Sequence, residues 1–491
     1  MASMDGSLDQ RYGLFKTKVC TKCHKSEKII RAMQIDKLNR IHLIGIGGTG
    51  MRGLALLLLQ KGCVVSGSDT DDSPYITTLQ EQGATIHIGH AAELIQDIDL
   101  IAFSTAIPKD NVERVAGEAK GIPCINRSEL LNLLLCEHTT RIAVAGTHGK
   151  TTTTAMIATI FAKKNLNPSY LIGSQLNTTN ISSQLGSSDY FITEADESDG
   201  SFLLLDSNCS VVTNIDNDHM NFFKTPENLL AHFTRFMEKT IQNKGALILN
   251  ADDPSILSCV DDSWRSHCLF FGINTPAFVQ AKDIRYHAKG VSFVLHIDQK
   301  AYKNVNLSIY GNHNIYNALA AVATALRGNI DPDTIIQGLE SFTGTQRRFQ
   351  KIADENGIQI YDDYAHHPTE IRTTLTSTRN SLNGRIICIF QPHRISRTEE
   401  LLSEFADSFH EIDKLVITNT YTTPNEKKDP RITTEALCET IRNNGQKNVS
   451  YIPNLTDIPR TIRPMLQKGD IVITMGAGNI HTVANELKRL L

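Results

Sequence analysis

This sequence of 491 residues has no long apolar run and no cysteine framework. No stretch reaches the roughly 18 apolar residues that a membrane-spanning helix needs, and residues 1–40 lack the hydrophobic core of a signal peptide. The ten cysteines are scattered, as is typical of reduced thiols. The net charge is only −4 and no long basic run offsets it, which argues against nucleic-acid binding. These absences predict a cytoplasmic protein with no membrane insertion and no nucleic-acid partner.

Internal repeats and low-complexity tracts are also lacking, and the length predicts about three domains of ordinary size. Alternating strand and helix signals predict an α/β fold of three consecutive units. We expect a Rossmann-like N-terminal domain at residues 39–136, a central P-loop ATPase domain with a parallel sheet at 137–345, and a Rossmann-like C-terminal α/β domain at 346–491. Residues 1–38 are expected to form a mobile N-terminal extension.

The first glycine-rich segment follows a short apolar run. Residues 41–44 (IHLI) predict a buried strand, residues 45–50 (GIGGTG) a tight turn and residues 51–61 a helix, which is the layout of a dinucleotide-type phosphate site. A second strand at 63–69 ends in Asp69, about 20 residues after the glycines, where a carboxylate could meet a ribose. These features alone would suit a dehydrogenase, but a dehydrogenase would leave the second glycine loop unexplained.

That second loop, AGTHGKTTTT at residues 145–154, follows the apolar run 141–144. Lys150 and Thr151 open the expected helix, where they would face a nucleotide phosphate and a magnesium ion. The spacing is the compact GxxGK[ST] form, because Val144 stands where the full P-loop has its first glycine. An ordinary turn between a strand and a helix is the alternative, but the lysine and the threonine run favour ATP binding.

Two further strands are followed by side chains that suit a metal ion. An acidic cluster at residues 194–199 follows one apolar run, and the sequence DNDH at 216–219 follows the next. Glu194 is the first candidate for a magnesium ligand, and His219 could help to hold a second metal at the same sheet edge. A solvated acidic loop and a structural histidine are the alternatives, but the repeated placement at strand ends favours function.

Six sequence blocks occur in the order seen in the Mur ligases, and the chain is similar to that family from about residue 41 to its C-terminus. The blocks are GIGGTGM at 45–51, AGTHGKTTTT at 145–154, EADESDGSF at 194–202, TNIDNDHM at 213–220, GNHNIYNALAA at 311–321 and YDDYAHHPTE at 361–370. Several blocks together are far more specific than any one. The resemblance implies an ATP-dependent acid–amino-acid ligase with three domains that close around the substrates.

The resemblance also implies roles for individual residues. Lys150, Glu194 and His219 would be catalytic, and two magnesium ions would be held by Thr151, Glu194 and His219. The ATP-binding set would be Gly146, Thr147, His148, Gly149, Lys150, Thr151, Thr152, Asn314, Asn317, Arg348 and Asp363. The UDP-sugar-binding set would be Gly47, Gly48, Gly50, Asp69 and Ser104. The amino-acid-binding set would be Tyr364, His366, Arg394 and Arg397. Surface arginines, and a histidine pair at His366 and His367 that merely caps a loop, are the alternatives for this last set.

The activity implied by the resemblance is ligation of L-alanine to the lactyl carboxylate of UDP-N-acetylmuramate, in peptidoglycan precursor synthesis. The carboxylate would attack ATP to give an acyl phosphate and ADP, and the amine of alanine would then displace phosphate. Two alternatives stay open: a recycling ligase that attaches a whole L-Ala-D-Glu-diaminopimelate tripeptide to the same sugar, and a non-catalytic protein that binds the nucleotide sugar. The oligomeric state leaves no readable mark in the sequence.

Two segments do not fit this interpretation. CTKCH at residues 20–24 matches the CxxCH haem pattern, and its CxxC could be half of a zinc site. Haem attachment needs an exported protein and zinc needs partner ligands, so we interpret the motif as an incidental pair of thiols. The loop YTTPNE at 421–426 departs from the small-residue and glycine pattern of the family, and its role is not predicted.

Overall fold

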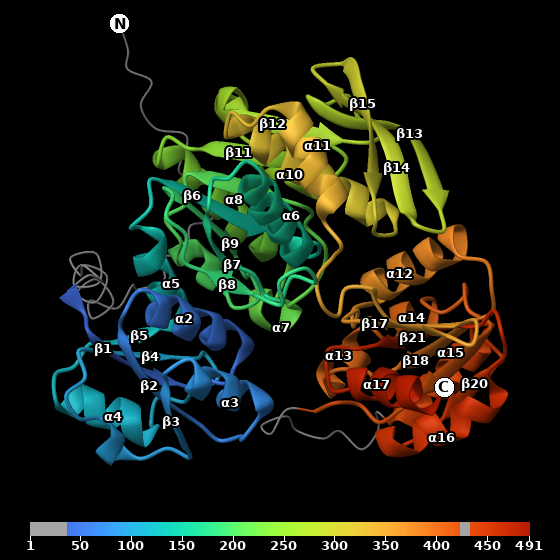
Figure 1. Cartoon of the computed structure of the whole chain (residues 1–491), viewed down its shortest axis with the longest axis horizontal. Coiled ribbons are helices and arrows are strands. Elements are labelled where there is room, and N and C mark those ends of the chain that lie inside the picture. The colour runs from blue at the N-terminus through green and yellow to red at the C-terminus, as the bar shows by residue number, and fades with distance from the viewer. Residues whose placement is uncertain (1–36, 423–432) are drawn as a thin grey trace, which may run out of the picture.

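The computed structural model describes residues 37–422 and 433–491; the CxxCH motif, the extension before residue 37 and residues 423–426 of the divergent loop lie outside these residues. In the described part of the chain, three sheets follow one another, with five, ten and six strands. Figure 1 shows them as three bodies, coloured blue, green to yellow, and orange to red. The predicted α/β fold of three sheet-based units is confirmed. Within the described ranges, no helix is long and apolar enough to cross a bilayer.

The first sheet has the order β3-β2-β1-β4-β5, and its described strand pairs are all parallel. The order reverses at β1, and such a switch point opens a crevice at the carboxyl ends of the strands. The glycine turn that follows β1 therefore lies where sheets of this type bind ligands. The elements are β1 (Arg40–Ile44), α2 (Thr49–Gln60), β2 (Val64–Asp69), α3 (Pro74–Glu81), β3 (Thr85–Ile88), η2 (Ala92–Leu94), β4 (Leu100–Phe103), α4 (Val112–Ala119), β5 (Cys124–Asn126) and α5 (Arg127–Leu135).

The central sheet has the order β15-β14-β13-β12-β11-β10-β6-β9-β7-β8. Its first half along the chain comprises β6 (Thr140–Ala145), α6 (Lys150–Lys163), β7 (Ser169–Leu171), β8 (Ser183–Gln184), β9 (Tyr190–Glu194), η3 (Ser201–Leu204), β10 (Cys209–Val212), α7 (Met220–Phe223) and α8 (Pro226–Gln242). Its second half comprises β11 (Ala246–Asn250), α9 (Pro254–Cys259), η4 (Asp262–His267), β12 (Cys268–Gly272), β13 (Val279–His287), β14 (Gly290–Ile297), β15 (Lys300–Leu307), α10 (Asn312–Arg327) and α11 (Pro332–Ser341).

The central sheet is parallel only in its interior. Strands from β7 through β9, β6, β10, β11 and β12 to β13 pair in parallel, as expected. At the two rims, β7–β8 and β13-β14-β15 pair antiparallel. Only two residues separate β13 from β14 and β14 from β15. Because a parallel connection needs a crossover of a dozen or more residues, these short turns force hairpins.

Helix α6 begins directly after the P-loop and lies against α10 and α11. Its interior residues are almost all buried, and α10 contributes a run of alanines from Ala318 to Ala325 that is interrupted only by Leu319, Val322 and Thr324. Small side chains let two helices approach closely. This packing fixes the first turn of α6 at the carboxyl end of β6.

The third sheet has the order β16-β17-β21-β18-β19-β20, with β16 antiparallel and the other described pairs parallel. Helix α17 follows β21. The elements are β16 (Gln350–Glu355), β17 (Ile358–Asp363), α12 (Pro368–Ser381), β18 (Ile386–Phe390), α13 (Ile395–Glu400), α14 (Leu402–Ala406), β19 (Lys414–Ile417), α15 (Thr434–Asn443), β20 (Val449–Tyr451), η5 (Leu455–Asp457), α16 (Ile458–Ile462), η6 (Arg463–Met465), β21 (Ile471–Met475) and α17 (His481–Leu490).

An apolar contact joins the first two units, and we call it the N-terminal interface. Helix α2 lies against β8, and α5 lies against η3. One buried apolar cluster runs through both units, from Leu54 on α2 to Phe233 on α8. Gly53 of α2 approaches Leu171 of β7 so closely that a Cβ there would collide with the leucine.

A polar contact joins the second and third units, and we call it the C-terminal interface. Side chains of the third unit reach the P-loop and the loop that follows β10. An aromatic group of Tyr310, Phe349 and Tyr361 accompanies them, with the last two rings stacked 4.4 Å apart. Hydrogen bonds across it include those from Arg348 to Thr151, from Thr369 to Asp216 and from Arg397 to Asp218, at 3.5, 2.9 and 3.5 Å.

Candidate active site

The P-loop turns tightly at two glycines. Gly146 and Gly149 have φ angles of 130° and 84°, a region that side chains other than glycine rarely adopt. A Cβ at Gly146 would collide with the Thr213 hydroxyl, and one at Gly149 with the Asn317 amide. Both glycines are therefore required by backbone conformation and by space.

Lys150 is held at the centre of this loop. Its Nζ donates to the carbonyls of Gly146 and Thr147 at 2.6 and 3.1 Å and lies 2.8 Å from a carboxylate oxygen of Glu197. Burial alone would lower the pKa of Lys150, but the carboxylates of Glu197 and Asp196 outweigh it and raise the pKa. A permanent positive charge thus lies where the loop would surround a phosphate.

Thr151 and Glu194 meet beside this lysine. The Thr151 hydroxyl donates to Glu194 Oε2 at 3.1 Å, and burial raises the pKa of Glu194. A hydroxyl and a carboxylate are the hard oxygen ligands that Mg²⁺ prefers, so the residues present fit a magnesium ion. The two strands β6 and β9 are adjacent and parallel, which is why the two side chains emerge at one edge.

His219 approaches the same site from β10. It has a left-handed φ of 59°, and its Nε2 lies 3.8 Å from Glu197 Oε1 and 3.6 Å from Asp218 Oδ2. Among the described residues, no hydrogen bond or ion pair joins His219 to Glu194. Glu197 contacts both Lys150 and His219, although sequence reasoning singled it out only as one member of an acidic cluster.

A cavity of about 500 Å³ opens between the central and third units. The expected ATP residues that line it are His148, Gly149, Thr152, Asn314, Asn317, Arg348 and Asp363. The other four expected ATP residues, Gly146, Thr147, Lys150 and Thr151, do not line the cavity and lie in the adjoining P-loop just described. Asn317 Nδ2 donates to Asn314 Oδ1 at 3.0 Å, and Asn314 Nδ2 donates to the Tyr310 carbonyl at 2.7 Å. These two amides hold the wall of the cavity, and their contact with adenine stays a prediction.

Asp363 and Arg348 lie on the third unit's side of this cavity. Asp363 is the last residue of β17, and burial raises its pKa to about 7. The Arg348 guanidinium lies 5.2 Å from the Tyr364 ring and donates to Thr151 at 3.5 Å. Arg348 is therefore placed to reach a ligand of the P-loop.

His148 links the P-loop to the third unit. Its Nε2 lies 3.0 Å from Asp216 Oδ2 and its Nδ1 lies 3.5 Å from Glu370 Oε1. Burial alone would lower the pKa of His148, but the Asp216 and Glu370 carboxylates raise it to about 9. Sequence reasoning missed Asp216 and Glu370, although both lie inside the blocks DNDH and HHPTE.

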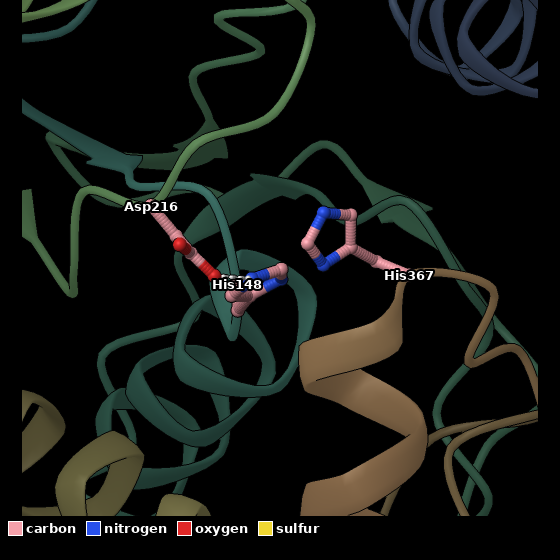
Figure 2. A group of neighbouring side chains, drawn as sticks. All are labelled: His148, Asp216 and His367. Carbon is pink, nitrogen blue, oxygen red and sulfur yellow. Dashed lines mark hydrogen bonds and ion pairs between the residues drawn. The ribbon is translucent and has the colours of Figure 1, made fainter. Parts of the chain in front are cut away.

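Figure 2 shows a second possible metal cluster, in which His148, Asp216 and His367 offer atoms within 4.8 Å of one another. His148 Nε2 is hydrogen-bonded to Asp216 Oδ2 at 3.0 Å. His367 Nδ1 accepts the Thr369 N–H at 3.3 Å, which leaves the proton of the neutral ring on Nε2. All three side chains therefore take part in hydrogen bonds within the protein.

The predicted UDP-sugar residues gather at the carboxyl edge of the first sheet. The Gly47 N–H donates to Asp69 Oδ2 at 2.8 Å, and Ser104 lies against Gly45. A side chain at Gly50 would meet Arg127, which the sequence did not single out. Arg127 in turn lies 3.5 Å from Asp196 and so connects this edge to the surroundings of Lys150.

The predicted amino-acid residues divide into two groups. Arg394 and Arg397 line a cavity of about 190 Å³ together with Asp218 and His219. Tyr364 and His366 do not line it; their rings lie edge to face 5.4 Å apart, and His366 lies 3.4 Å from Glu370. Burial lowers the pKa of His366 to about 4. Their contact with alanine stays a prediction.

Three family models match this chain. The model described as Mur ligase family, catalytic domain, matches residues 40–139, the Mur ligase middle domain matches 144–325, and the glutamate ligase domain of Mur ligases matches 347–478. Together they span most of the sequence. The chain belongs to the Mur ligase family.

Individual relatives are similar over nearly the whole chain. UDP-N-acetylmuramate--L-alanine ligase of Geotalea uraniireducens (strain Rf4) is 40% identical over 451 residues, which are 92% of this chain and 98% of that protein. The solved UDP-N-acetylmuramate-alanine ligase MurC of Thermotoga maritima has a TM-score of 0.79 at 26% identity, covering 92% and 98% of the two chains. The murein peptide ligase of Psychrobacter arcticus 273-4 has a TM-score of 0.66 at 26% identity, covering 91% and 98%.

Proposed function

We propose that this chain joins L-alanine to the lactyl carboxylate of UDP-N-acetylmuramate, using ATP and releasing ADP and phosphate, in peptidoglycan precursor synthesis. The observation that carries the proposal is the position of Lys150. It lies beside a Thr151–Glu194 pair that fits magnesium, while Arg127 of the first unit and Arg348 of the third reach the residues around it. Three substrates brought by three units would meet there. The high identity to alanine-adding relatives supports the choice of substrates.

The reaction needs activation because a carboxylate is a poor electrophile. The lactyl carboxylate attacks the γ-phosphorus of ATP, the bond to the β–γ bridging oxygen breaks, and an acyl phosphate and ADP result. The amine of alanine then attacks the acyl carbon, phosphate leaves, and the amine proton passes to the departing phosphate or to water. Lys150 would stabilise the negative charge on the transferring phosphoryl group, which requires positioning and electrostatics more than acid–base help.

Magnesium, when bound by Thr151 and Glu194, would neutralise phosphate charge and orient the phosphoryl group. A second ion near His219 and Glu197 is part of this proposal. The proposal also includes the ATP-binding, UDP-sugar-binding and amino-acid-binding residues predicted from the sequence. Its domain limits are 39–136, 137–345 and 346–491. Because ATP and nucleotide sugars are made inside cells, the proposal places the reaction in the cytoplasm.

The smaller cavity, which Arg394 and Arg397 line, favours a small acceptor. Its volume of about 190 Å³ lies below the roughly 300–1,000 Å³ of ordinary ligand pockets. The arginines at Arg394 and Arg397 would hold a carboxylate, and Asp218 and Glu400 offer carboxylates to an ammonium group. This arrangement suits free alanine better than a tripeptide.

The test is a turnover assay with ATP, Mg²⁺, UDP-N-acetylmuramate and either L-alanine or the L-Ala-D-Glu-diaminopimelate tripeptide. We expect phosphate release and a product whose mass has risen by one alanine residue. Lys150→Ala should abolish both signals. Preference for the tripeptide would make the chain a recycling ligase, and failure with both acceptors would favour the non-catalytic binding protein.

A further inference from the structure

His367 has one ring nitrogen in use and one without a partner. It precedes helix α12 and caps it, because its Nδ1 accepts the Thr369 N–H. Only 5% of the residue is exposed to solvent. Burial, the largest cause, lowers the pKa of His367, so the ring is neutral with its proton on Nε2. In the described part of the chain, this buried Nε2 has no hydrogen-bond partner.

The carboxylates of Asp216 and Asp218, which act electrostatically on His367, already accept hydrogen bonds from other groups. Asp216 Oδ2 already accepts from His148 and from the Thr369 hydroxyl, and Asp216 Oδ1 accepts from the Asn217 N–H. Asp218 Oδ1 is likewise shared by the His219 N–H and Arg397. Buried donors are almost always satisfied in folded proteins. An acceptor supplied by a bound ligand explains the unpaired donor.

His367 itself lines neither cavity of the site, but residues next to it line both. The larger cavity is lined by Thr369 and Glu370, which follow it on α12, and by His148 across the C-terminal interface. The smaller is lined by Asp218, whose charge is the largest electrostatic influence on the pKa of His367 after burial. Figure 2 shows the His367 ring projecting from the start of α12 toward His148, at a centroid distance of 5.4 Å. The phosphates and the amino acid must meet in this region.

The helix itself favours an anion at this point. The start of α12 carries the positive end of its dipole, and α12 is 14 residues long. The His366 and His367 N–H groups are already taken by Glu370, so they are not available to a ligand. The Nε2–H of His367 is the donor that extends this positive end into the site.

We infer that His367 is a further catalytic residue of the proposed reaction, and that its Nε2–H donates a hydrogen bond to an anionic oxygen of the reacting acyl phosphate. The inference rests on the proposed function. It requires no proton transfer, because the neutral imidazole acts only as a donor. The expected effect is on the chemical step, since the oxygen gains negative charge there.

Two substitutions of His367 test the roles of its two ring nitrogens separately. His367→Asn keeps a side-chain oxygen that caps α12 as Nδ1 does, but it removes the Nε2 donor. His367→Gln places an amide N–H near the position of Nε2 and gives up the short cap. We expect His367→Asn to lower kcat about 100-fold with KM for ATP and alanine nearly unchanged, the size of effect seen for one lost oxyanion donor. His367→Gln should retain more of kcat and lose more thermal stability.

A second measurement is independent of the organic substrates. Calorimetry with MgADP and aluminium fluoride, a mimic of the transferring phosphoryl group, should show about tenfold weaker binding by His367→Asn than by the unaltered protein, as for the loss of about 1.4 kcal/mol. MgADP alone should bind both equally.

These experiments distinguish a failure of the His367 inference from a failure of the proposed function. Wild-type-like kcat in His367→Asn, or equal loss in both variants together with equal loss of stability, would overturn the inference while the proposed function stands. If the unaltered protein turns over neither acceptor, the proposed function fails. The phosphoryl mimic then decides whether His367 still serves as a donor to a phosphoryl oxygen.

Discussion

The two interfaces between the three units differ in polarity, because one is apolar and the other is polar. At the N-terminal interface, Gly53 and Leu171 pack within an apolar cluster that continues from one unit into the next. At the C-terminal interface, charged and hydroxyl side chains meet, as in the Thr369–Asp216 and Arg397–Asp218 pairs. Separating the first contact would expose apolar surface to water, whereas water can replace the hydrogen bonds of the second.

The difference indicates which unit moves. A domain contact that is large and apolar is rigid, and a polar contact permits relative motion. The larger cavity lies at the polar contact, and both His148 of the second unit and Arg348 of the third line it. We therefore expect substrate binding to close the third unit onto the first two, which act as one body. Substitutions at the C-terminal interface should change activity, and those at the N-terminal interface should change stability.

The largest expected effect comes from Arg348. Arg348→Ala removes the cation that reaches Thr151 across the C-terminal interface, and kcat/KM for ATP should fall about 100- to 1,000-fold. Lys351→Ala, an exposed residue in an ion pair with Asp354, is the matched control and should change little. Phosphate-release kinetics measure both. An Arg348→Ala enzyme that loses stability but not catalytic efficiency would contradict the expectation that the C-terminal interface governs activity.

The next effect depends on pH. The pKa of His148 is raised from its ordinary value of 6.5 to about 9, so the stabilisation from its pairing with Asp216 and Glu370 is complete below pH 6.5. It is lost as the pH rises through about 9, by up to about 3 kcal/mol. Melting temperatures between these limits should fall more steeply in the unaltered protein than in His148→Asn. His410→Asn, at an exposed position, should keep the original slope.

The N-terminal interface should respond to overpacking. Gly53→Val would collide with Leu171 and destabilise the protein by about 2 kcal/mol, the usual cost of an extra side chain in a packed core. Chemical denaturation measures this change, and KM for ATP should stay constant. Adding Leu171→Ala makes room, so the double variant should be more stable than the sum of the two single changes predicts. Additive losses would show that the two residues do not share the contact.

The smallest effect is expected at Thr369. Thr369→Val removes the hydrogen bond to Asp216 across the C-terminal interface, which should cost about 1 kcal/mol. Thr376→Val, on the exposed side of the same helix, is the control. Small-angle scattering with and without ATP should show a less complete closure for Thr369→Val only. Equal closure of the two variants would show that this hydrogen bond does not help to hold the third unit in the closed position.

Local patterns predicted the parts of the site that lie within one strand, turn and helix. The glycine turn after β1, the P-loop before α6 and the placement of Glu194 at the end of β9 follow from short-range sequence signals, because the carboxyl ends of parallel strands share an edge. The antiparallel rims of the central sheet were not predicted. The two turns of the β13-β14-β15 rim, at residues 288–289 and 298–299, lack the Asn-Gly or Asp-Gly signature of a hairpin.

Pairings between distant segments could not be predicted in the same way. Glu370 meets His148 although 222 positions separate them, and Asp216 meets Thr369 across 153. No local periodicity records such a contact, since it depends on how two separately folded units pack. The histidine pair shows the limit most clearly: His367 does cap a helix, as the alternative held, and only the burial of its other nitrogen reveals a free donor.

The contrast between the interfaces also makes ionic strength a control variable. Added salt screens the charges between the second and third units, whereas a strongly hydrated salt such as sulfate strengthens apolar packing between the first and second. One addition therefore loosens the contact through which Thr369 holds Asp216 and tightens the one in which Gly53 meets Leu171. Dissolved ions would therefore shift the third unit toward its open position and, at the same time, make the contact between the first two units more stable.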